Sequence, residues 1–130
     1  RDWSSDVCSS DLKAARRKPS AGPADMNKLE AAYADLLETR RRRDEILAWK
    51  FEAVKLRLAA NTFYTPDFMV WHNDGSLELV ECKGFWRDDA RVKIKVAAEL
   101  FPCFRFTAVQ RLTKKQGGGW LGEEIRRRLT

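Results

Sequence analysis

The chain has 130 residues, of which 25 are Lys or Arg and 19 are Asp or Glu, so its formal net charge is +6. The length suits one domain, and 44% hydrophobic residues are enough for a packed core, which argues against a disordered chain. Three cysteines and one histidine disfavour a disulfide scaffold, a zinc site and a histidine-based triad. No apolar run approaches the roughly 18 residues of a membrane span. We therefore expect a basic cytoplasmic domain with a polyanionic partner.

The first 25 residues differ in composition from the rest of the chain. Residues 1–12 resemble translated sequencing-adapter read-through, the alternative being a natural polar tail, and they are excluded from the fold. Residues 13–25 are basic and rich in Pro, Ala, Gly and Ser, which is typical of a flexible lead-in. We expect translation to begin at Met26 and residues 26–130 to form a single domain.

The first helix is predicted over residues 27–43. Asn27 can cap it, and Glu30 follows at the spacing of a capping box, ahead of an apolar stripe with helical period. Four arginines end the helix, where cations suit the negative end of its dipole. Alternating apolar and charged residues then predict a strand over residues 46–58.

A β-hairpin is predicted next. Aromatic and β-branched residues at 64–71 and an alternating segment at 77–83 are separated by Asn73-Asp74-Gly75, a turn signal.

The remaining elements complete an α/β pattern. A helix is predicted from residue 88 to about residue 100, since Pro102 ends it, followed by a strand at 104–109 and a short basic helix at 121–129. The order α-β-β-β-α-β-α predicts a mixed β-sheet flanked by helices.

Two carboxylates and a lysine are expected to meet on this hairpin. If Gly75 is left-handed in a three-residue loop, paired positions sum to 148 and Asp67 lies opposite Glu81. Glu81 and Lys83 share a face because side chains alternate with period two. Cys82 points into the core, which leaves its backbone carbonyl as a candidate metal ligand. Oxygen donors without imidazole favour Mg²⁺ or Mn²⁺.

The bare tripeptide Glu-x-Lys is weak evidence, because it occurs by chance roughly 0.5 times in a chain of this length. Alternating charges on a strand usually form a solvated face. Leu77 and Leu79, however, share the face of Glu81, and an acid on an apolar face needs a partner or a metal. The geometry alone leaves both interpretations open.

A family resemblance favours the metal site. Pro66-Asp67, followed after thirteen intervening residues by Glu81-Cys82-Lys83, matches the motif of the PD-(D/E)XK nuclease superfamily. The wider strings at 64–68, 81–86 and 88–93 resemble phage-type endonucleases, especially the endonuclease I type of Holliday-junction resolvase, over about residues 27–110. That type has Thr where this chain has Cys82, a position facing away from the site. The resemblance implies a restriction-endonuclease-like fold and a phage or prophage protein in a bacterial host cell.

The resemblance also implies roles for individual residues. Asp67 and Glu81 would hold the metal, and Lys83 would act on the attacking water. An acidic residue on the first helix would complete the site; Glu30 matches and is favoured, with Glu38 as the alternative, although Glu30 also fits as a capping-box residue. A homodimer acting on branched DNA is further implied.

Two groups of cations are candidates for DNA contact. On a helical projection Lys93 falls within an apolar arc, so it either extends to solvent or contacts a phosphate. Arg91 and Lys95 lie on the opposite, solvent side, where they bind DNA or only aid solubility. The arc comprises Val92, Ile94, Val96, Ala97, Leu100 and Phe101.

The second group ends the first helix. Clustered cations are sufficient for sequence-independent phosphate contact, and a solvated helix end is the alternative. These residues are Arg40, Arg41, Arg42 and Arg43.

The sequence therefore predicts a Mg²⁺- or Mn²⁺-dependent DNA endonuclease that hydrolyses phosphodiester bonds, with branched DNA as the expected substrate. One alternative is a nicking or restriction-like nuclease acting on ordinary duplex. The other is a catalytically silent DNA-binding or phage assembly module on the same fold.

Overall fold

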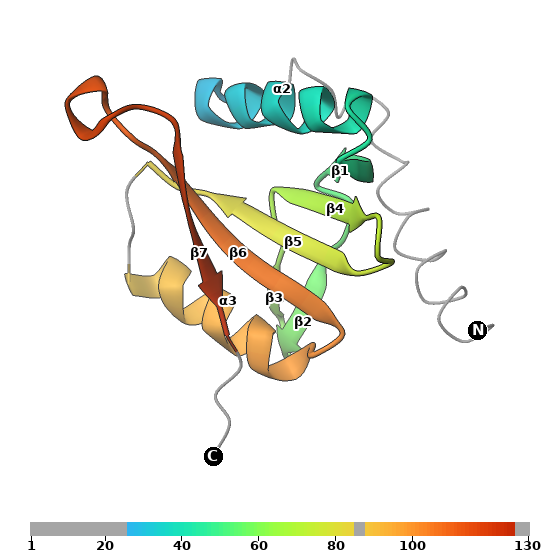
Figure 1. Ribbon diagram of the computed structural model, residues 1–130. Coiled ribbons are helices and arrows are strands. Elements are labelled where there is room, and N and C mark those ends of the chain that lie inside the picture. Colours follow the sequence, from blue (N-terminus) through green and yellow to red (C-terminus); the bar gives the residue numbers. More distant parts are fainter. Residues whose placement is uncertain (1–25, 85–87, 127–130) are drawn as a thin grey trace.

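The computed structural model describes residues 26–84 and 88–126, and Figure 1 shows how their elements are arranged. The elements in chain order are α2 (Lys28–Arg42), β1 (Ile46–Phe51), β2 (Leu56–Ala59), β3 (Thr62–Tyr64), β4 (Phe68–His72), β5 (Leu77–Cys82), α3 (Asp88–Leu100), β6 (Phe104–Arg111), the 3-10 helix η2 (Lys114–Gln116) and β7 (Trp120–Ile125).

A five-stranded mixed sheet in the order β1-β4-β5-β6-β7 forms the centre of the domain. Only β5 and β6 are parallel, and α3 makes the crossover between them. Helix α2 covers one face of the sheet, while α3 and the small β2–β3 sheet cover the other (Figure 1). The expected α/β class, a mixed sheet flanked by helices, is confirmed.

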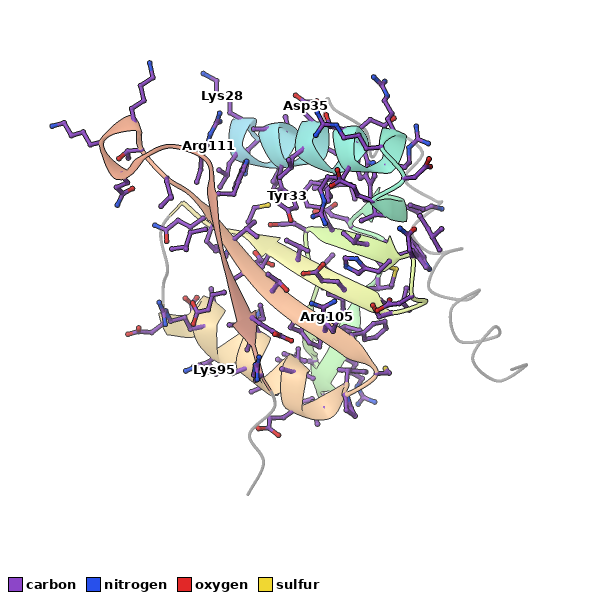
Figure 2. All side chains as sticks on the ribbon, viewed as in Figure 1. Lys28, Tyr33, Asp35, Lys95, Arg105 and Arg111 are labelled. Carbon is purple, nitrogen blue, oxygen red and sulfur yellow. The ribbon has the colours of Figure 1, made fainter. Side chains whose placement is uncertain are left out.

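Helix α2 begins as predicted. Asn27 Oδ1 accepts the Glu30 N–H at 2.8 Å, and Glu30 Oε1 accepts the Asn27 N–H at 3.0 Å, so the capping box is reciprocal. The helix buries Tyr33, Ala34 and Leu37 against the sheet, and Figure 2 shows Tyr33 between α2 and the strands.

The register of the β4–β5 hairpin is also confirmed. Phe68 pairs with Val80 and Trp71 with Leu77, so paired positions sum to 148. Gly75 has φ +89°, a backbone conformation that its missing Cβ permits, and its N–H donates to the His72 carbonyl.

The single strand expected over residues 46–58 is wrong. The first strand ends before Glu52, where φ is +48°. The next strand, β2, pairs with β3 in a separate sheet. Tyr64 accordingly belongs to β3, and Thr65, Pro66 and Asp67 separate it from β4. The pairing of β2 with β3 decides this arrangement, and the alternation of apolar and charged residues does not show which segments will pair.

The helix expected over residues 121–129 is wrong as well, and so is the order α-β-β-β-α-β-α. Residues 120–125 form β7, which pairs with β6 from Arg111 to Phe106. A Gly at position 122 costs a helix about 1 kcal/mol, and the open edge of β6 supplies the hydrogen bonds that a strand requires. Residues 127–129 of the expected helix lie outside the described residues.

The buried face of α3 differs from the predicted arc. Ile94, Ala97 and Ala98 are buried, whereas Val92 and Leu100 are more than half exposed. Val96 is also exposed. Two adjacent alanines let the helix approach the sheet closely, and this packing turns the larger valines outward.

Each face of the sheet has its own core. Phe68, Val80 and Cys82 pack toward α2, whereas Met69, Leu79 and Phe106 pack toward α3. No helix in the part of the chain that the structure describes is both long and apolar enough to cross a membrane.

Candidate functional site

Asp67 and Glu81 form a buried carboxylate pair on the α3 side of the sheet. Their exposed fractions are 8% and 7%, and no other charged residue in the described ranges is buried. The register brings them together, because Asp67 Oδ2 accepts the Cys82 N–H at 2.8 Å. The Asp67 carbonyl accepts the Glu52 N–H at 2.8 Å, which fixes the backbone before β4.

Glu81 is held by two donors. The Tyr64 hydroxyl donates to Oε1 at 2.7 Å, and Lys83 Nζ lies 3.1 Å from Oε2. The sequence interpretation placed Glu81 and Lys83 together, and the structure does the same. The sequence interpretation gave Tyr64 no role. Its place three residues before Asp67 in the quoted motif was the sign that could have identified it.

Ionising both carboxylates of the pair is unfavourable in this buried site. Burial, and then the charge of Glu81, raise the pKa of Asp67 to about 8, against the opposing effects of the Cys82 N–H and of Lys83. Burial also raises the pKa of the Tyr64 hydroxyl, and Glu81 adds to that effect. Tyr64 therefore keeps its hydroxyl proton and remains a hydrogen-bond donor at neutral pH.

The charge of Glu30 adds a smaller contribution to the raised pKa of Asp67, although α2 covers the opposite face of the sheet. Its Oε1 is nevertheless engaged by the Asn27 N–H. The alternative helix acid, Glu38, accepts hydrogen bonds from Arg41, Arg42 and Trp49. Of the two helix acids, Glu30 is thus the one whose charge acts on Asp67, but the structure does not gather it with the carboxylate pair.

Cys82 adopts the predicted orientation. Its side chain belongs to the core beneath α2, and burial raises the pKa of its thiol. Its backbone faces the site, because its N–H donates to Asp67.

The donor set suits a hard cation held by few protein ligands. Across residues 26–84 and 88–126, no three His, Cys, Asp or Glu side chains gather closely enough to form a metal cage. Mg²⁺, however, usually keeps several waters and takes one or two carboxylates together with substrate phosphates. Asp67 and Glu81 supply two such carboxylates, and a divalent ion would offset the repulsion between them when both are ionised.

The cations of α3 that were candidates for DNA contact are exposed. Lys93 Nζ lies 3.4 Å from the Phe63 carbonyl, next to Tyr64. Arg91 and Lys95 are exposed, and Figure 2 shows Lys95 on the α3 side of the molecule.

The arginines that were candidates for DNA contact lie at the opposite end of α2 from Glu30. Twelve residues separate Glu30 from Arg42, which is about 18 Å along a helix axis. Arg41 and Arg42 pair with Glu38 at 2.6 and 3.3 Å, and Arg40 pairs with Glu45 at 3.5 Å. Arg43, the residue that caps the helix, is exposed.

Strand β7 brings a further acid onto the same face. Ala108 pairs with Glu81 on one side and with Glu123 on the other, so the three residues form one row across the sheet. Glu123 is exposed and lies about 10 Å from Glu81 along the row. Sequence reasoning missed it because this segment was expected to be helical.

The protein is therefore a mixed α/β domain with a buried carboxylate pair beside a lysine. Residues 24–117, which are 94 of the 130 residues, match a family described as "Protein of unknown function (DUF1064)". The chain belongs to this family. Searches of curated proteins and of solved structures found no match. Phe85 and Trp86, which are part of the motif strings, lie outside the described residues.

Proposed function

We propose that the protein is a metal-dependent DNA endonuclease of the PD-(D/E)XK class with a restriction-endonuclease-like fold. The observation that carries this proposal is the buried Asp67–Glu81 pair with Lys83 Nζ 3.1 Å from Glu81. These are the residues of the nuclease motif, and a buried, like-charged pair is costly to fold unless a cation or another function compensates.

Each side chain then has a defined task. A bound Mg²⁺ or Mn²⁺ would polarise the phosphate and favour deprotonation of the attacking water. Asp67 and Glu81 bind the ion, and Tyr64 orients Glu81 through its hydroxyl. Lys83 orients the attacking water or stabilises the charge that develops on the phosphate.

The resemblance to junction-resolving enzymes extends the proposal to branched DNA and to a homodimer, because two symmetric cuts need two sites. It also assigns the protein to the cytoplasm of a bacterial host cell, as a phage or prophage product.

The test compares cleavage of a four-way junction and of a linear duplex of equal length by the full chain, with MgCl₂ or with EDTA. We expect junction cleavage that requires Mg²⁺ and is lost in Asp67→Asn, Glu81→Gln and Lys83→Ala. Glu78→Gln is the matched control, since Glu78 lies on β5 but on the opposite face, bonded to His72 and Thr107. Cleavage that persists in EDTA or in Lys83→Ala contradicts the proposal.

Two other results lead to the alternatives. Equal cutting of both substrates leaves a general nicking or restriction-like nuclease. Binding without cutting favours a silent DNA-binding or phage assembly module, which would agree with a Glu30 whose Oε1 is occupied by helix capping.

A further inference from the structure

The β2–β3 hairpin presents two different faces. Tyr64 turns inward and donates its hydrogen bond to Glu81. Phe63, the preceding residue, points outward, with 40% of its surface exposed. Arg57 on β2 pairs with Phe63 and shares its outward face. An exposed aromatic residue, Phe63, is therefore the chain neighbour of the tyrosine that hydrogen-bonds to Glu81.

Three cations lie close to Phe63. Lys55 Nζ lies 4.6 Å from the centroid of the Phe63 ring, and Lys93 Nζ lies 3.4 Å from the Phe63 carbonyl. Arg57 is the cross-strand neighbour. Within the described ranges, none of the three forms an ion pair with a carboxylate, whereas Arg40, Arg41 and Arg42 each do. The three charges are thus available to an external anion.

We propose that Phe63, Lys55, Arg57 and Lys93 form a DNA-binding face that holds an unpaired nucleotide beside the cleaved phosphodiester, an inference that rests on the proposed function. Clustered unpaired cations attract phosphates, and an exposed aromatic ring stacks on bases. An acidic protein could form ion pairs with the three cations, but it would offer no base to stack on the Phe63 ring. A base inside a regular duplex cannot stack on a side chain, so the face selects branched or frayed DNA.

The position of this face explains how binding would lead to cleavage. A nucleotide stacked on Phe63 lies on the far side of β3 from Tyr64 and Glu81. The adjoining backbone needs only to pass the edge of this three-residue strand to reach the carboxylates. Lys93 lies along that route, since it approaches the backbone of Phe63 from α3.

The test measures binding by fluorescence anisotropy in EDTA, where no metal-dependent cleavage occurs, with the full chain and labelled branched and linear DNA. The hairpin triple variant carries Lys55→Ala, Arg57→Ala and Lys93→Ala. We expect it to bind branched DNA at least about tenfold more weakly at 0.1 M salt, with the slope of log K against log salt reduced by about 2 to 3. A control variant removes three exposed lysines elsewhere, Lys50, Lys114 and Lys115, and should stay within about threefold of wild type.

Phe63 variants test the stacking. Phe63→Leu should weaken binding of branched DNA about fivefold or more and leave linear duplex unchanged, whereas Phe63→Trp should retain affinity. Circular dichroism confirms folding, which these exposed positions should not disturb.

Several results would overturn the inference. One is a hairpin triple variant that binds like wild type. Another is an equal loss in the control. A third is a loss only in a rival triple variant with Arg40, Arg42 and Arg43 changed to Ala.

Failure of the inference is separable from failure of the proposed function. Metal-dependent cleavage by wild type, with unchanged DNA binding by the hairpin triple variant, overturns the binding face alone. Loss of binding in the hairpin triple variant, with no cleavage by wild type, leaves a DNA-binding face and overturns the nuclease. If wild type binds neither DNA in EDTA, the face does not serve DNA, and an acidic protein partner becomes the candidate.

Discussion

Replacing Asp67 with Asn removes one of two adjacent buried carboxylates and keeps an amide oxygen that can accept the hydrogen bond from the Cys82 N–H. Burial and the charge of Glu81 raise the pKa of Asp67 from its ordinary 3.8 to about 8. Ionisation of Asp67 is therefore less favourable in the folded protein than in the unfolded chain, so it lowers the stability of the fold. Without a metal ion, we expect Asp67→Asn to stabilise the fold.

The sign and size follow from linkage between protonation and folding. Because the folded pKa is the higher one, the stabilising contribution of protonated Asp67 is complete below about pH 4 and is lost as the pH rises to about 8. Each pH unit between the ordinary pKa of 3.8 and pH 7 corresponds to about 1.4 kcal/mol. The gain in the free energy of unfolding that Asp67→Asn can bring at pH 7 is therefore at most about 4 kcal/mol. We expect Asp67→Asn to gain at least about 1 kcal/mol in the free energy of unfolding at pH 7, which raises its Tm by about 4 to 8 °C.

Thermal unfolding of both proteins in EDTA at pH 5, 7 and 8.5, followed by circular dichroism, checks this prediction. The Tm of Asp67→Asn should exceed that of wild type by an amount that grows with pH. Adding 10 mM MgCl₂ should raise the Tm of wild type only, because the ion binds the intact pair. A pH-independent difference, or a variant less stable than wild type at pH 8.5 in EDTA, would refute the reasoning.

Four other substitutions test the surroundings of the site. Tyr64→Phe removes the donor to Glu81 and should lower the free energy of unfolding in urea by about 1 to 3 kcal/mol. Glu30→Gln keeps a capping-box side chain and should stay within about 0.5 kcal/mol of wild type, whereas Asn27→Ala should lose about 1 kcal/mol; undiminished cleavage in Glu30→Gln would exclude Glu30 from the site. Gly75→Ala forces a left-handed alanine and should cost about 1 to 2 kcal/mol in the same urea experiment, and no loss would contradict the turn geometry.

The carboxylate pair could be predicted because it depends on local geometry. A left-handed Gly75 fixes the hairpin register, and that register places Asp67 opposite Glu81 without any knowledge of the rest of the fold. The capping box of α2 was predictable for the same reason, since Asn27 and Glu30 interact within one helical turn.

Features that depend on distant pairing could not be predicted. Tyr64 reaches Glu81 only because β3 folds back against the sheet, and Glu123 joins the row only because β7 pairs with β6. The orientation of α3 depends on how closely two alanines let it approach the strands, which hydrophobic periodicity does not report. In each case tertiary packing overrides the local pattern.

The central claim is that Asp67 and Glu81 together bind a divalent ion, and direct titration with Mn²⁺ tests it without knowledge of the substrate. Free Mn²⁺ is followed by electron paramagnetic resonance at pH 8, with wild type, Asp67→Asn, Glu81→Gln and the opposite-face control Glu78→Gln. We predict at least one Mn²⁺ per chain in wild type and in Glu78→Gln, and at least a tenfold weaker affinity in the two site variants. Equal Mn²⁺ affinity in all four proteins, or no binding by wild type, would contradict the account.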